Sequence, residues 1–165
     1  MNNIKGKIWL FGDDINTDLM YPQVCYTLPE SEKPSYAMRA NRPEWAEMVS
    51  PGDIIVAGRN FGTGSSRPAA DNIKNLGIAC VLAESINGLF LRNAVNSGFL
   101  SLEAKNISSS VREGDTITVN MEKNVIESQN LILPFRPLPP FLMDIIENGG
   151  IINILKKRGM LGDPL

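Results

Sequence analysis

The chain has 165 residues, of which 43% are hydrophobic and 21% are charged, which is typical of a globular domain with a sizeable core. Its net charge of −2 and isoelectric point of about 5.2 provide no basic field to attract nucleic acid or an anionic membrane. Histidine is absent and the two cysteines, Cys25 and Cys80, lie far apart, so a disulfide framework, a cysteine–histidine metal cluster and a histidine base are all excluded.

The sequence also lacks the signals of secretion and membrane insertion. The first residues contain no apolar signal core, and no run approaches the ~20 apolar residues of a membrane span. We therefore expect a cytoplasmic protein in which both cysteines are small buried apolar residues.

The first element expected is a strand over residues 4–11 that ends at Gly12. A polar loop over residues 13–18 follows, and its D-x-N-x-D spacing from Asp14 resembles a calcium loop. However, Leu19 and Cys25 occupy the positions where such a loop needs Gly and Glu. The polar side chains of this loop either cap their own backbone or bind a polar ligand.

Residues 21–50 contain four prolines and few apolar runs, so they predict a long irregular excursion. Such segments in compact domains are usually lids or binding loops, or are poorly ordered. Short helices are expected over residues 36–39 and 43–49. Arg39 and Arg42 either bind an anion or are solvated.

A strand, a turn, a helix and a second strand are expected over residues 53–83. Residues 53–57 and 78–83 are continuous apolar runs, typical of buried parallel strands. Residues 68–76 predict a helix with Pro68 in its first turn and Gly77 at its end. The order of these elements predicts a right-handed crossover.

The turn between them, residues 58–67, is the most informative stretch of the chain. Its glycines permit unusual backbone angles and a close approach by a ligand. Ser65, Ser66 and Arg67 precede the helix, where backbone N–H groups and a guanidinium favour an anion. A serine-capped turn with a solvated arginine is the alternative. A P-loop is excluded because no lysine is present, and a dinucleotide fingerprint because Arg67 replaces its third glycine.

The remaining elements follow in order. We expect a helix over residues 90–96, a strand over 99–102, antiparallel strands within 111–130, and helices over 141–147 and 151–157.

Residues 60–67, Asn-Phe-Gly-Thr-Gly-Ser-Ser-Arg, resemble the signature of the swivelling domain of the aconitase superfamily. More narrowly, the chain resembles the small subunits of 3-isopropylmalate dehydratases and their relatives. The similarity covers nearly the whole chain, with further matches at residues 14–18, 51–58, 92–98 and 145–151.

The resemblance implies an α/β fold, a swivelling β/β/α three-layer domain with a mixed sheet. This would be a single domain over residues 1–165, with a substrate-selecting loop region at 19–50 and C-terminal helices at 135–165. It implies the small subunit of a hydro-lyase, which dehydrates and rehydrates a malate-type hydroxy acid through an alkene. The [4Fe–4S] cluster, a Lewis acid for the departing hydroxyl, would lie on a separate large subunit in a heterodimer or heterotetramer, with no metal on this chain.

The same resemblance assigns roles to individual residues. Ser65 would be the catalytic base, Ser66 and Arg67 would bind a substrate carboxylate, and Thr17 and Asp18 would line the site. The chain departs from the family where Pro68-Ala69-Ala70 replaces Glu-His-Ala. Pro68 also disfavours a helical backbone at Arg67, which suggests a different substrate.

Isomerisation of 3-isopropylmalate, a step of leucine biosynthesis, is the first substrate expectation. Met20, Tyr26 and Leu28 in the loop region favour an alkyl-substituted malate over a tricarboxylate. A dehydratase of 2,3-dimethylmalate, of another alkylmalate or of a citrate-like acid is the alternative within the class. A non-catalytic anion-binding module, active without a partner, is the alternative outside it.

Overall fold

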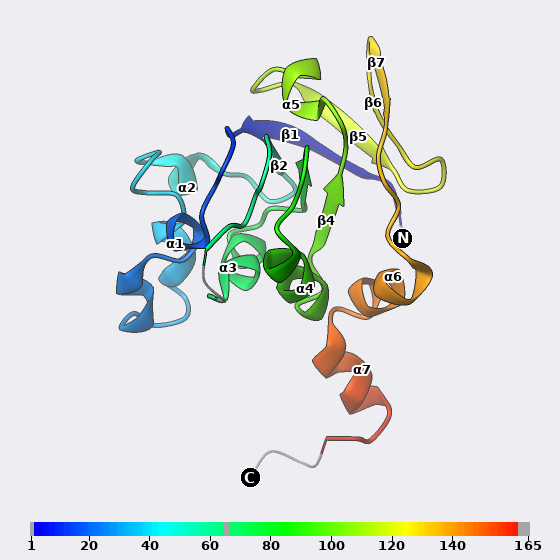
Figure 1. Cartoon of the computed structure of the whole chain (residues 1–165). Helices are drawn as coiled ribbons and strands as arrows, with labels where there is room; N and C mark the ends of the chain where they lie inside the picture. Colours follow the sequence, from blue (N-terminus) through cyan, green and yellow to red (C-terminus); the bar gives the residue numbers. More distant parts are fainter. Residues whose placement is uncertain (1, 65–66, 162–165) are drawn as a thin grey trace.

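The structure is a computed structural model that describes residues 2–64 and 67–161 (Figure 1). The strands are β1 (Ile4–Leu10), β2 (Ile54–Ala57), β3 (Cys80–Ala83), β4 (Leu100–Glu103), β5 (Thr116–Asn120), β6 (Val125–Ser128) and β7 (Leu131–Pro134). The α-helices are α1 (Thr17–Met20), α2 (Trp45–Met48), α3 (Ala69–Asn75), α4 (Gly88–Asn96), α5 (Ile107–Ser110), α6 (Pro140–Glu147) and α7 (Ile151–Lys157), and the 3₁₀ helices are η1 (Gln23–Tyr26) and η2 (Lys33–Tyr36). None of the helices in the described ranges is long and apolar enough to cross a bilayer.

Within the described ranges, the strands form one mixed sheet of seven strands in the order β4-β3-β2-β1-β5-β6-β7. Strands β1 to β4 run parallel, and β5, β6 and β7 pair antiparallel. Strand β1 belongs to both halves, since Ile8 pairs with Ile54 of β2 whereas Ile4 pairs with Val119 of β5.

Both faces of the parallel strands are covered. On one face, β1, β2 and β3 pack against α1 to α4 in a cluster that includes Trp9, Ile55, Val81, Ile73 and Phe90 (Figure 1). On the other face, the same strands pack against β5 and β6, with α5 and α6 at the margin, in a cluster that includes Ile54, Leu82, Val119, Ile126 and Ile146. Burial on both faces explains the continuous apolar runs. The expected β/β/α layering with a mixed sheet is confirmed.

Most of the predicted elements are present within a few residues. The strands expected at 53–57 and 78–83 are β2 and β3, and they pair in parallel. The helix expected at 68–76 is α3, and Pro68 is the residue before its first turn rather than within it. The C-terminal helices appear as α6 and α7.

Other expectations were wrong. No helix covers residues 36–39, because η2 ends at Tyr36 and Met38 has a φ of 60°. The polar loop over 13–18 gives way to helix α1 at Thr17, where the Asn16 side chain accepts a hydrogen bond from the Asp18 N–H. Helix α5 was not expected, and a third antiparallel strand, β7, extends beyond residue 130.

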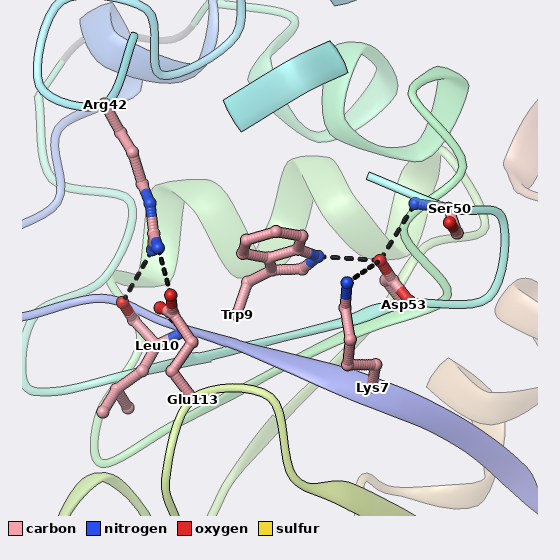
Figure 2. A network of polar contacts seen from close by, with 7 residues as sticks. All are labelled: Lys7, Trp9, Leu10, Arg42, Ser50, Asp53 and Glu113. Carbon is pink, nitrogen blue, oxygen red and sulfur yellow. Dashed lines mark hydrogen bonds and ion pairs between the residues drawn. The ribbon is translucent and has the colours of Figure 1, made fainter. Parts of the chain in front are cut away.

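Asp53 joins the turn before β2 to strand β1 (Figure 2). Asp53 is 5% exposed, and its carboxylate accepts hydrogen bonds from the Trp9 indole N–H at 2.7 Å and from the Ser50 N–H at 2.9 Å. The Lys7 ammonium lies 4.0 Å from the same oxygen. These donors satisfy a carboxylate that would otherwise be costly to bury.

Arg42 joins the excursion to the carboxyl end of β1 (Figure 2). Its guanidinium hydrogen-bonds to the Glu113 carboxylate and to the Leu10 carbonyl, and it lies 5.2 Å from the Trp9 ring centroid. The Glu113 carboxylate also accepts a hydrogen bond from the Leu10 N–H at 3.2 Å. Arg42 is therefore neither simply solvated nor a receptor for an external anion.

The Arg42–Glu113 pair predicts a weak dependence of stability on pH. The hydrogen bond from Arg42 is the main reason why the pKa of Glu113 lies below its ordinary value of 4.5. A carboxylate with a lowered folded pKa stabilises the protein above its unfolded pKa, and this contribution is lost as pH falls towards the folded pKa. We expect Glu113→Gln to reduce the free energy of unfolding at about pH 6 by less than about 1 kcal/mol, because the pair is partly exposed.

Urea unfolding at about pH 6 and about pH 3 checks this expectation. The difference between wild type and Glu113→Gln should shrink at the lower pH. Glu122→Gln is the control, because Glu122 is exposed and has no ion pair within the described ranges. A difference that grows on acidification would contradict the assignment.

Candidate functional site

Three loops meet at the carboxyl ends of the parallel strands. The loop after β2 forms an isolated bridge to the loop after β1 through Thr63 and Asn16, and another to the loop after β3 through Phe61 and Ile86. The Thr17 N–H donates to the Thr63 carbonyl at 2.8 Å. The glycine-rich loop therefore lies between its two neighbours, where open α/β sheets usually bind ligands.

Close packing explains the glycines of this loop. Gly62 has a φ of +80°, and an added Cβ would lie 2.3 Å from Cβ of Phe90. Gly64 has a φ of +105°, and its Cβ would lie 2.5 Å from Oδ1 of Asn16. Both positions combine a left-handed backbone with no space for a side chain, as expected of this turn.

Most polar side chains of residues 13–18 stabilise these loops. The Asp13 carboxylate accepts a hydrogen bond from the Arg59 N–H at 2.7 Å, and the Asp14 carboxylate accepts one from the Asn60 side-chain amide at 2.7 Å. Asn16 caps α1. Of these three residues, only Asn16 caps the backbone of its own loop, as the first interpretation expected, whereas Asp13 and Asp14 bind the loop after β2.

Thr17, Asp18 and Arg67 are brought together at one side of the site. Thr17 is buried, and Asp18 follows it in the first turn of α1. The Arg67 Nε lies 2.6 Å from Oδ1 of Asp18, and its Nη1 donates to the Tyr21 carbonyl at 3.1 Å. The predicted positions Ser65 and Ser66 lie outside the described residues.

Arg67 precedes helix α3 rather than opening it. Pro68 has a ψ of 48°, and the Ala69 N–H donates to the Arg67 carbonyl at 2.7 Å. The proline thus inserts a tight turn between Arg67 and the helix.

Two cavities flank the segment from Arg67 to Asp71. One, of about 270 Å³, is lined by Arg67, Asp71, Asn93 and Asn96 among others. The second, of about 320 Å³, lies between α3 and the excursion and is lined by Lys33 among others. A larger cavity of about 430 Å³ lies against α6 and contains none of the predicted site residues, so the chemistry of the lining, and not volume, identifies the site.

Both cysteine thiols are buried, so neither is available to bind a ligand or a metal ion. Burial raises the pKa of Cys80 to about 12, and it also raises the pKa of Cys25, although Lys33 and Arg67 partly oppose that shift. Both thiols are therefore protonated at neutral pH. Among residues 2–64 and 67–161, no group of three or more histidine, cysteine or acidic side chains is arranged to hold a metal ion.

Asn72 was missed by the sequence analysis. It is 3% exposed, and its side-chain amide donates to the Met20 carbonyl at 2.7 Å and to the Lys33 carbonyl at 3.3 Å. The sequence contained one indication of this role, because Asn72 lies on the buried face of α3 with Ala69 and Ile73. A polar residue at such a position needs partners.

Comparison with known sequences identifies a matching protein family and several similar proteins. The Aconitase C-terminal domain family matches residues 9–107. The isopropylmalate/citramalate isomerase small subunit of Methanocaldococcus jannaschii is 44% identical over 160 residues, covering 94% of this chain and 95% of the relative. The homoaconitase small subunit of Thermus thermophilus is 36% identical over 156 residues, covering 93% and 96%.

A solved structure shows the same fold. The crystal structure of 3-isopropylmalate dehydratase from Methanocaldococcus jannaschii superposes with a TM-score of 0.90 at 34% sequence identity, covering 96% of each chain. The chain belongs to the aconitase C-terminal domain family, among relatives of the 3-isopropylmalate dehydratase small-subunit type.

Proposed function

We propose that this chain is the small subunit of a hydro-lyase that isomerises 3-isopropylmalate by dehydration and rehydration, the leucine-biosynthesis step. The observation that carries the proposal is the meeting of the signature loop with Thr17 and Asp18, where Arg67 lies 2.6 Å from the Asp18 carboxylate. Relatives of nearly the same length are named as small subunits of this enzyme. The whole chain, residues 1–165, would act as one swivelling domain.

In this proposal Ser65 is the base. As the alkoxide, it takes a proton from the carbon next to a carboxylate while the neighbouring carbon loses hydroxide, so an alkene forms and the proton and the hydroxide together are the elements of water. Water then adds back with the two positions exchanged. A serine hydroxyl is a weak base unless its alkoxide is stabilised, so Ser66 and the Arg67 guanidinium are assigned to the alkoxide and to a substrate carboxylate.

The [4Fe–4S] cluster is assigned to a large partner subunit, where it would supply Lewis acidity towards the departing hydroxyl. The described part of this chain offers no suitable donor group, and both of its thiols are buried and protonated. The names of the relatives, which are small subunits, support a heterodimer or heterotetramer.

The position of Tyr26 supports the assignment of the substrate. Its ring lies 5.7 Å from the Arg67 guanidinium carbon, so an apolar surface adjoins the proposed carboxylate binder. This arrangement suits an alkyl-substituted malate. One relative is named for citramalate and another is named a homoaconitase. Citramalate and homocitrate are therefore the substrates to compare with 3-isopropylmalate.

Reconstitution tests the proposal. This chain is mixed with the cluster-bearing large subunit from the same host, and the complex is supplied with 3-isopropylmalate, citramalate, 2,3-dimethylmalate and homocitrate. Alkene formation is followed by ultraviolet absorbance. Turnover of 3-isopropylmalate by the complex and not by either chain alone is expected. Binding of a dicarboxylate by this chain without any turnover of the complex would instead favour a non-catalytic anion-binding module.

Arg67→Lys is expected to raise KM for the hydroxy acid by about tenfold to a hundredfold. An ammonium cannot contact Asp18 and Tyr21 as the guanidinium does while also gripping a carboxylate with two parallel hydrogen bonds. Steady-state kinetics of the complex measure the effect. Arg59→Lys is the matched control, because Arg59 lies in the same loop with its side chain 78% exposed. Equal KM values in the two variants would remove Arg67 from the substrate site.

A further inference from the structure

The buried side chain of Asn72 bridges the two ends of the loop formed by residues 20–33. The Asn72 amide donates to the Met20 carbonyl at one end of this loop and to the Lys33 carbonyl at the other, at 2.7 and 3.3 Å. Both neighbours are acceptors, so the amide nitrogen and not its oxygen must face them. Each N–H group of the amide thus binds one end of the loop.

This loop has little secondary structure to hold it in place. It contains the end of the four-residue helix α1, the 3₁₀ helix η1 and the start of η2, which are too short to be stable alone. Val24 and Tyr26 at its tip are exposed. Its position over α3 therefore depends on tertiary contacts, which are the burial of Met20, Tyr21 and Cys25 in the core and the buried hydrogen bonds of Asn72.

The same loop carries groups that contact Arg67. The Tyr21 carbonyl accepts a hydrogen bond from the Arg67 guanidinium at 3.1 Å, and the Tyr26 ring packs edge-on against Tyr21 with centroids 5.1 Å apart. A displacement of the loop would move the Tyr21 carbonyl, which is one of the groups that orient the Arg67 guanidinium. It would also move Tyr26, the apolar surface beside the guanidinium.

We propose that Asn72 is a positioning residue that fixes the loop of residues 20–33 over Arg67 and so sets both the affinity for the hydroxy acid and the preference among alkyl groups. The proposal rests on the proposed function for its catalytic part only. Asn72 does not touch substrate; it acts through the loop, and through Tyr21 and Tyr26 on Arg67.

The structural part is tested by hydrogen exchange on the isolated full-length chain. We expect Asn72→Leu, which keeps the branching and the number of heavy atoms and removes both donors, to speed exchange of amides in residues 20–33 by about tenfold, while amides of β2 and β3 keep wild-type protection. Asn75→Leu is the control, because Asn75 lies in the same helix and is exposed. Unchanged exchange in residues 20–33 would overturn the proposal.

The catalytic part is tested on the reconstituted complex. Asn72→Leu is expected to raise KM for 3-isopropylmalate by about tenfold with kcat within about twofold of wild type, and to narrow the ratio of kcat/KM between 3-isopropylmalate and citramalate. A fall in kcat with KM and the substrate ratio unchanged would overturn the positioning role. If the wild-type complex turns over none of the acids, the proposed function fails and the exchange result alone decides whether Asn72 clamps the loop.

A second variant covers failure to fold. Asn72→Ser keeps one hydroxyl donor and is smaller, so it is measured in the same two assays if Asn72→Leu is not folded. Changes in the same direction, about threefold in exchange and in KM, are expected. Wild-type values in both assays would refute the clamp.

Discussion

Replacing Ser65 with alanine is expected to lower kcat of the reconstituted complex by about 1,000-fold, with KM changed far less. The variant removes the oxygen assigned as base, and positioned acid–base groups typically contribute effects of this size. It retains Ser66 and Arg67, to which carboxylate binding is assigned. The measurement is steady-state turnover of 3-isopropylmalate by the complex of the variant with the large subunit.

Two further measurements make this result interpretable. Ser109→Ala, on the exposed face of α5, should leave kcat at the wild-type value. Co-purification of the Ser65→Ala chain with its partner shows that loss of turnover is not loss of assembly. Substantial turnover by an assembled Ser65→Ala complex would show that another group takes the proton, and the assignment of Ser65 as base would be abandoned.

The largest effect on stability is expected from Gly62→Ala. The added methyl group would lie 2.3 Å from Cβ and 2.4 Å from Cγ of Phe90, in a backbone with a φ of +80°. Phe90 is 1% exposed and its ring packs edge-on against Phe61 at 5.2 Å, so it has little room to move. We expect a loss of at least about 3 kcal/mol, a large share of the stability of a typical domain.

Gly114→Ala separates the two causes of this loss. Gly114 has a similar φ of +86°, but an added Cβ would meet nothing within 4 Å. That variant should lose only about 1–2 kcal/mol, the ordinary cost of a left-handed alanine. Urea unfolding of the isolated chain, followed by far-ultraviolet circular dichroism, gives both values. Equal losses would mean that backbone conformation, and not contact with Phe90, explains the glycine.

The interior of the fold was predictable because burial leaves a direct mark on composition. Strands β2 and β3 are apolar at every position, since helices cover one face and the antiparallel strands cover the other. By contrast, the site formed by the signature, residues 60–67, together with Thr17 and Asp18 was predicted only from the resemblance to a known family. Composition and spacing alone left a capped turn equally open.

Apart from α2, which lies within the helix expected at residues 43–49, the local structure of the excursion was not predictable, for a physical reason. Helix α1 and the 3₁₀ helices are single turns, too short to show a periodic pattern. Their positions depend on pairs that are distant in sequence, such as Arg42 with Glu113 and Asn72 with Lys33. Nothing in a local window identifies such partners. The buried Asn72 was the one accessible signal, as a polar residue on an otherwise apolar helix face.

The double use of β1 has a consequence for how the chain is made. Ile8 pairs with Ile54 and Ile4 pairs with Val119. Strand β1 is synthesised before the other six strands, so it cannot complete its pairing until the chain has been synthesised as far as β5. Pairings that join such distant residues are slow to form, and an unpaired strand is prone to aggregate meanwhile. Nascent chains halted before residue 116 should therefore remain protease-sensitive at their amino terminus and rely on chaperones, whereas chains released after residue 134 should acquire protection there in one step.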